Sequence, residues 1–141
     1  MKTIVYVYGT LRTGHPSADL HSIPGSLFDL GWFPGYRPEG DGTVTVERVQ
    51  CDIPIENFDS YEGYHPRHES GSLYLRKPLK DGWIYVYNQD FGRLSSSQTA
   101  IPSGDWINYI RDTNKAGNYG RFHLEKYVAP VVEPLKEKET T

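Results

Sequence analysis

The clearest pattern along the chain is that of β-strands. Residues 3–8, TIVYVY, are all β-branched or aromatic and predict a first strand. Residues 43–53, TVTVERVQCDI, carry valines at an alternating period and predict a second, longer strand. Two further strands are predicted over residues 73–79 and 83–88, joined through Asp81-Gly82, a dipeptide typical of hairpins.

Two segments instead have apolar residues at helical spacing. The first covers residues 54–62, where Pro54 suits a first helical turn and Gly63 suits a left-handed stop. The second runs through DWINYIRDTN, residues 105–114, and we expect Ser103 to cap its N-terminus.

The order of these elements indicates an α+β fold. Residues 17–21 are expected to form a short helical turn, and residues 25–42 short strand pieces separated by glycine and proline turns. A length of 141 residues favours one domain, placed here at residues 1–128. The remaining residues, 129–141, are rich in Pro, Glu, Lys and Thr and are expected to be extended or disordered.

Composition excludes several classes of protein. The net charge of −3 gives no electrostatic footprint for nucleic acid. No apolar run approaches the ~18–20 residues that a membrane span requires. The N-terminus lacks a signal peptide's basic region followed by an apolar stretch and goes directly into a strand. The single Cys51 fits a reducing compartment, so we expect a cytoplasmic protein.

The glycine turn after the first strand raises a chemical question. Gly9 and Gly14 have the glycine spacing of a phosphate-binding loop, which then requires Lys followed by Ser or Thr. Here the next residues are His15 and Pro16, so both the charge and the metal-binding hydroxyl are missing. The turn is therefore not expected to bind a nucleotide.

Metal binding and nucleophilic catalysis are also disfavoured. His65 and His68 are three residues apart around a proline, which is not the spacing of a zinc-binding helix, and we expect solvated loop histidines. Cys51 lies inside a predicted strand, where a free cysteine is usually a small buried hydrophobe. The serines at 95–97 lack a Gly-x-Ser-x-Gly elbow. No metal is expected.

Glu62 is the strongest candidate for acid–base chemistry. It falls at the C-terminus of a predicted helix, where the helix dipole disfavours a negative charge, and it is flanked by Phe58, Tyr61 and Tyr64. These surroundings should raise its pKa, so it could remove a proton near neutral pH and later return it. The alternative is an ordinary surface glutamate.

Taken in order, these segments resemble one known family. The motifs are VYVYGTLR, LFDLGWFPGY, FDSYEGY, LYLR and WIYVY, spread over about residues 3–87. This series is similar to the γ-glutamylcyclotransferase-like superfamily, and most similar to its small AIG2-like branch, which includes γ-glutamylamine cyclotransferases. Tyr-Gly-Thr-Leu alone would be a weak signal, but it becomes specific with the downstream Asp-x-x-Glu-Gly and Tyr-x-Arg.

The resemblance implies a small mixed β-barrel with short flanking helices. It also implies that Tyr8, Gly9, Thr10 and Leu11 hold the γ-glutamyl group, largely through backbone groups, and that Glu62 transfers protons. The reaction implied is an intramolecular aminolysis that gives 5-oxoproline and a released amine or amino acid, without a cofactor.

Several alternatives stay open. Arg12 could add charge to the substrate site or point to solvent. Hydrolysis could replace cyclisation, and the barrel could instead serve a non-catalytic binding protein. The family usually carries a Gly-Glu pair in the strand before the helix, where this chain has TVERV at residues 45–49. Residues 88–125 could form a lid or a surface for a protein partner. We expect a catalytic Glu62 to face a closed pocket beside residues 8–11.

Overall fold

The computed structural model describes residues 2–31, 33–88 and 99–113. The predicted tail and the end of the predicted second helix lie outside these ranges, as does most of the segment 88–125. The elements, in chain order, are β1 (Thr3–Val7), β2 (Leu20–Pro24), β3 (Ser26–Asp29), β4 (Pro34–Arg37), β5 (Thr43–Cys51), α1 (Ile55–Glu62), η1 (Glu69–Gly71), β6 (Tyr74–Leu79), β7 (Gly82–Tyr87), β8 (Thr99–Ala100) and α3 (Trp106–Asp112).

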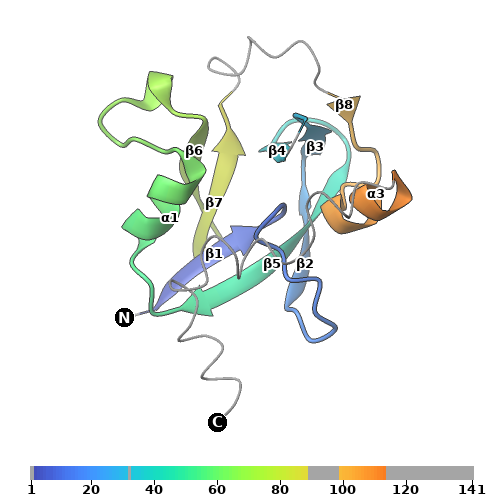
Figure 1. Ribbon diagram of the computed structural model, residues 1–141, viewed down its shortest axis with the longest axis horizontal. Helices are drawn as coiled ribbons and strands as arrows, with labels where there is room; N and C mark the ends of the chain where they lie inside the picture. The colour runs from blue at the N-terminus through green and yellow to red at the C-terminus, as the bar shows by residue number, and fades with distance from the viewer. Residues whose placement is uncertain (1, 32, 89–98, 114–141) are drawn as a thin grey trace.

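A five-stranded sheet forms the centre of the molecule, in the order β2-β5-β1-β7-β6. Figure 1 shows β1 lying between β5 and β7. β1 is antiparallel to β5, with Val5 opposite Val49, and parallel to β7. Val5, Tyr6 and Val7 of this central strand are all buried, which explains why its sequence is apolar at successive positions.

A second sheet of three short strands, β4-β3-β8, continues from the first. The chain passes from β2 into β3 through Gly25, which has a φ of +140° that other residues rarely adopt. The helical turn predicted at residues 17–21 is wrong, because β2 begins at Leu20 and pairs with β5.

The prediction of a mixed α+β fold is confirmed, but the prediction of a barrel is wrong because the two sheets do not close. β4 packs against β7, and Gly35 allows this approach: a Cβ at that position would lie 2.9 Å from the Cβ of Tyr87. β4 is only four residues long, however, and begins at Pro34, which has no N–H to donate to a ladder. The described strands β4 and β7 therefore meet through side chains.

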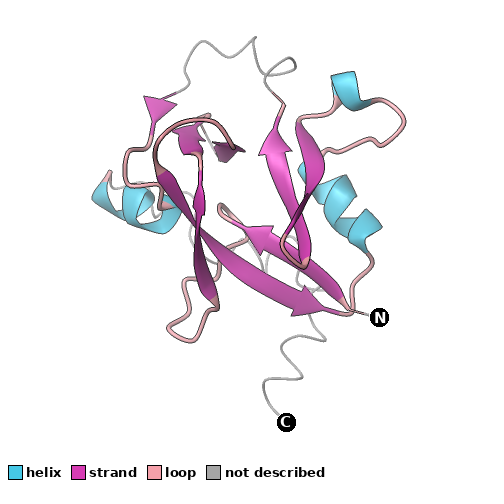
Figure 2. Cartoon of the chain, turned by 180° about the vertical axis from the view of Figure 1, so that it is seen from behind, coloured by secondary structure: helices cyan, strands magenta, loops and turns pink. Residues whose placement is uncertain are grey.

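The two helices flank the strands on opposite sides, as Figure 2 shows. α1 begins after Pro54 and ends at Gly63, which is left-handed with φ 70°, so the predicted boundaries are confirmed. The predicted cap of α3 is wrong. Asp105 is the N-cap and accepts a hydrogen bond from the Asn108 amide, while the Ser103 hydroxyl accepts one from the amide of Asp105. In the described ranges, no helix is long and apolar enough to span a membrane.

Candidate active site

A cavity of about 420 Å³ lies where the end of β1 meets α1, β6 and β7. Its lining combines aromatic side chains with the glycine turn that follows β1, and it contains one carboxylate among the described residues. The lining residues are Tyr6, Val7, Tyr8, Gly9, Thr10, Leu11, Phe33, Pro34, Tyr61, Glu62, Leu73, Tyr74 and Tyr85. A volume of this size suits a small metabolite.

Glu62 supplies that carboxylate. It is the last residue of α1, held at this place by the left-handed stop at Gly63. Burial raises its pKa from 4.5 to about 8, because the charged form loses hydration. No described residue donates a hydrogen bond that would offset this loss. The predicted upward shift of the Glu62 pKa is thus confirmed, and its cause is removal from water.

The aromatic wall around Glu62 remains neutral. The pKa values of Tyr8 and Tyr74 lie well above the ordinary value, first through burial and then through neighbouring negative charge that includes Glu62. Their hydroxyls are engaged in holding the fold. Tyr8 donates to the Tyr85 carbonyl at 2.6 Å and accepts from the Tyr36 amide at 3.2 Å, while Tyr74 donates to the Pro34 carbonyl.

The turn opposite Glu62 leaves two backbone donors available. The Arg12 amide donates to the Gly9 carbonyl at 2.9 Å, which closes a tight turn around Thr10 and Leu11. Within the described part of the chain, the amides of Thr10 and Leu11 have no acceptor. Gly9 is required here because a Cβ would lie 2.5 Å from the Pro34 ring, so the close approach that glycine permits is to β4.

One hydrogen bond ties the turn to the helix. The Thr10 and Tyr61 hydroxyls lie 3.2 Å apart, and Tyr61 directly precedes Glu62. The structure therefore brings Glu62 together with Tyr8, Gly9, Thr10 and Leu11 around one cavity, although more than fifty positions separate them in the chain.

Comparison with known proteins agrees with this arrangement. The family model described as "Gamma-glutamyl cyclotransferase, AIG2-like" matches residues 5–108. The chain belongs to this family. The match extends past residue 87, where the sequence motifs end, and includes the first residues of α3.

Individual relatives of this AIG2-like protein are known from sequence and structure. A Vibrio cholerae protein named "Putative gamma-glutamylcyclotransferase" is 31% identical over 122 residues, which are 78% of this chain and all of the relative. YtfP from Escherichia coli has 26% identity and a TM-score of 0.51, covering 79% of this chain and 99% of its own. YkqA from Bacillus subtilis shares the fold at 21% identity and a TM-score of 0.55, covering 90% of this chain and 53% of its own.

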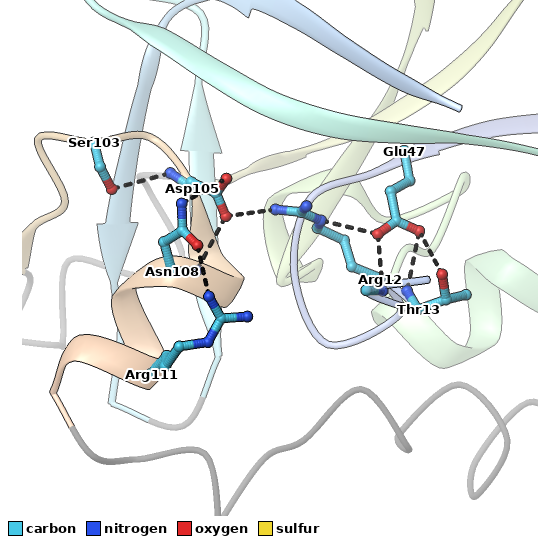
Figure 3. A network of polar contacts seen from close by, with 8 residues as sticks. Arg12, Thr13, Glu47, Ser103, Asp105, Asn108 and Arg111 are labelled. Carbon is cyan, nitrogen blue, oxygen red and sulfur yellow. Dashed lines mark hydrogen bonds and ion pairs between the residues drawn. The ribbon is translucent and has the colours of Figure 1, made fainter. Parts of the chain in front are cut away.

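The structure directs Arg12 away from the cavity of this AIG2-like protein. Its side chain is buried, with Nε 3.1 Å from Glu47 and a terminal nitrogen 2.9 Å from Asp105 (Figure 3). Arg12 is not among the residues that line the cavity. The guanidinium of Arg12 therefore pairs with carboxylates of β5 and of the N-cap of α3, and it neither lines the cavity nor points to solvent.

Asp59 and Arg76 position α1, a role that sequence reasoning missed. Asp59 accepts hydrogen bonds from Arg76 at 2.8 Å and from the Tyr85 hydroxyl at 2.6 Å. Arg76 also lies over the ring of Trp83, at 4.6 Å from its centroid. Asp59 and Glu62 are three residues apart, which puts both on one face of the helix. This spacing was the signal in the sequence that Asp59 lies near Glu62 in the structure. The Asp-x-x-Glu-Gly and Tyr-x-Arg motifs, which are separate in the sequence, thus contact each other through the ion pair between Asp59 and Arg76.

Metal ligation has no evident site in the described ranges, which hold no group of three or more His, Cys, Asp or Glu side chains that could bind an ion. His65 and His68 are exposed on the loop after α1.

Proposed function

We propose that this protein cleaves a γ-glutamyl compound by intramolecular aminolysis, releasing an amine or amino acid and forming 5-oxoproline. The observation that carries the proposal is Glu62, whose pKa is raised to about 8 and which shares its cavity with Thr10 and Leu11, whose amides have no acceptor among the described residues. Family membership supports the same class of reaction.

In the proposed reaction Glu62 acts twice. Its carboxylate removes a proton from the substrate's α-ammonium group, and the free amine attacks the γ-carbonyl carbon. A C–N bond forms and closes the five-membered ring. The bond from that carbon to the leaving nitrogen then breaks as protonated Glu62 returns the proton. The ring nitrogen gives up its second proton by the same route, so that the products are a neutral lactam N–H and an ammonium on the leaving group. No water is consumed and no cofactor is required. A base with a pKa of about 8 is well matched to an ammonium group, since proton transfer between similar pKa values is nearly balanced.

The cavity contributes mainly by holding the substrate curled. Ring closure is already intramolecular, and well-oriented closures of this kind reach effective molarities of ~10⁵ M or more. The amides of Thr10 and Leu11 are available to bind the α-carboxylate of the glutamyl group. The wall formed by Phe33, Pro34 and Leu73 is apolar and limits the access of water, which favours cyclisation over hydrolysis.

The test is to incubate the protein with a panel of γ-glutamyl amines and γ-glutamyl dipeptides and to measure 5-oxoproline. Glu62→Gln should lower kcat by ~10²–10⁴-fold, the range of general acid–base catalysis. Glu39→Gln is the matched control, because Glu39 is exposed and pairs with Arg37 away from the cavity.

Three results would contradict the proposal. Turnover that survives Glu62→Gln would remove the proposed role of Glu62. Release of glutamate in place of 5-oxoproline would indicate hydrolysis. Binding of panel members without turnover would indicate a non-catalytic binding protein.

A further inference from the structure

A second buried glutamate, Glu47, lies in the middle of β5 with only 2% of its surface exposed. Its carboxylate accepts four hydrogen bonds, all from the segment after the glycine turn. The donors are Arg12 Nε at 3.1 Å, the Thr13 amide at 3.0 Å, the Thr13 hydroxyl at 3.1 Å and the Gly14 amide at 3.1 Å (Figure 3).

These bonds hold the turn from one end. The other end is held by β1, whose last residue, Val7, pairs with Glu47 itself in the β1–β5 ladder. Between the two anchors lie Thr10 and Leu11, whose amides have no acceptor among the described residues. A loop held in this way keeps its free donors in one orientation before a ligand arrives, so the ligand does not have to order them.

We infer that Glu47 is a positioning residue, which orients the amides of Thr10 and Leu11 for the α-carboxylate of the γ-glutamyl substrate. The inference rests on the proposed function and extends it to a residue that does not line the cavity. Arg12 has a part in the same assembly, because its guanidinium balances the buried carboxylate and continues to Asp105, the N-cap of α3.

The chemistry of the four contacts requires a carboxylate. Both Glu47 oxygens act only as acceptors, with two donors on each. Glutamine would replace one oxygen by an NH₂ group that faces two donors, leaving them unpaired and repelling the loop. Aspartate would keep the charge but would be one methylene too short to reach all four donors.

The experiment compares Glu47→Gln with wild type on whichever panel member is turned over fastest. Binding the α-carboxylate equally in the ground and transition states affects KM, so KM should rise at least ~10-fold while kcat stays within ~3-fold. The pH midpoint of kcat/KM, set by Glu62, should not move. Thr13→Ala removes one of the four bonds and should raise KM by only ~2–5-fold, which provides a second variant that keeps the Glu47 charge paired.

The matched control is Asp29→Asn. Asp29 is another buried carboxylate, bonded to the Gly31 amide and the Tyr109 hydroxyl, but it lies in the second sheet and outside the cavity lining. If KM rises equally in Asp29→Asn, the effect reflects general destabilisation and the inference is overturned. An unchanged KM in folded Glu47→Gln, or a loss confined to kcat, would also overturn it.

Calorimetric titration with 5-oxoproline provides a readout that does not depend on turnover. Wild type should bind it, and Glu47→Gln should bind at least ~10-fold more weakly. If wild type neither binds 5-oxoproline nor turns over the panel, the proposed function fails together with this inference. If wild type does both and Glu47→Gln matches it, only the role of Glu47 is lost.

Discussion

Glu62 and Glu47 are two glutamates withdrawn from bulk water in one chain, and their surroundings are opposite. Glu47 is saturated, with four donors around its carboxylate, one of which belongs to the Arg12 guanidinium. Glu62 faces a cavity walled by aromatic rings, without a hydrogen bond from any described residue, and burial raises its pKa to about 8. A satisfied carboxylate can organise a loop, whereas an unsatisfied one is prepared to exchange a proton.

The largest expected effect on stability is at Glu47. Glu47→Ala would leave the Arg12 guanidinium short of one partner in a buried site and free the loop amides. Removing one member of a buried ion pair costs about 3–5 kcal/mol. We expect urea denaturation at pH 7 to show a loss of about 3 kcal/mol, against less than about 0.5 kcal/mol for the exposed Glu39→Ala. A loss below about 1 kcal/mol would mean that the network contributes little.

The Glu62 carboxylate should have the opposite effect on stability, because its charged form is destabilising. Its folded-state pKa is about 8 against an ordinary 4.5, so the folded chain keeps a proton that the unfolded chain has lost between these pH values. Stability should therefore fall as pH rises through this window, by at most about 1.4 kcal/mol per pH unit. Since Glu62 retains some contact with water at the cavity, we expect a smaller total.

Glu62→Gln removes this titration. The variant should be more stable than wild type by about 2 kcal/mol at pH 8, and the difference should disappear toward pH 4.5. Paired thermal or urea denaturation at the two pH values measures it. Equal stability of the two proteins at pH 8 would show that the carboxylate is better hydrated than its surroundings suggest.

The smallest effect on stability and activity is expected at the contact between the glycine turn, which Glu47 holds, and α1, which carries Glu62. Thr10→Val keeps the shape of the side chain but removes the hydrogen bond to Tyr61 that joins the glycine turn to α1. A single bond of this kind contributes about 1 kcal/mol. Stability should fall by about that amount and kcat/KM by less than ~10-fold, since both glutamates keep their own contacts. A larger loss of activity would assign the Thr10 hydroxyl a direct role in catalysis.

Features with local causes could be predicted from the sequence. The boundaries of α1 follow from Pro54 and Gly63, and the hairpin of β6 and β7 follows from its Asp-Gly dipeptide. The direction of the Glu62 pKa shift could also be predicted from the aromatic residues beside it in the sequence, although the burial that causes the shift depends on the cavity that β1, β6 and β7 complete.

Features that depend on residues far apart in the chain could not be predicted from the sequence. Closure of a barrel depends on whether β4 and β7 form a ladder, and nothing near either strand in the chain indicates the answer. The direction of Arg12 depends on Glu47 and Asp105, which are 35 and 93 positions away. Glu47 itself lies where the family pattern is broken by Val46, so its sequence context obscured it. The available sign was an acidic residue in the middle of a strand whose valines, Val44, Val46 and Val49, indicate burial.

The two sheets meet at a seam without a backbone ladder, and this seam determines which wall of the cavity can vary in sequence. Backbone ladders tolerate little change, but the seam is joined by side chains, including the Tyr8 hydroxyl to the Tyr36 amide and the Tyr74 hydroxyl to the Pro34 carbonyl. Phe33 and Pro34 reach the cavity from this second sheet, while the glycine turn and Glu62 belong to the first sheet and its helix. Substitutions along the seam can thus reshape the wall formed by Phe33 and Pro34, while the glycine turn and Glu62 keep their places.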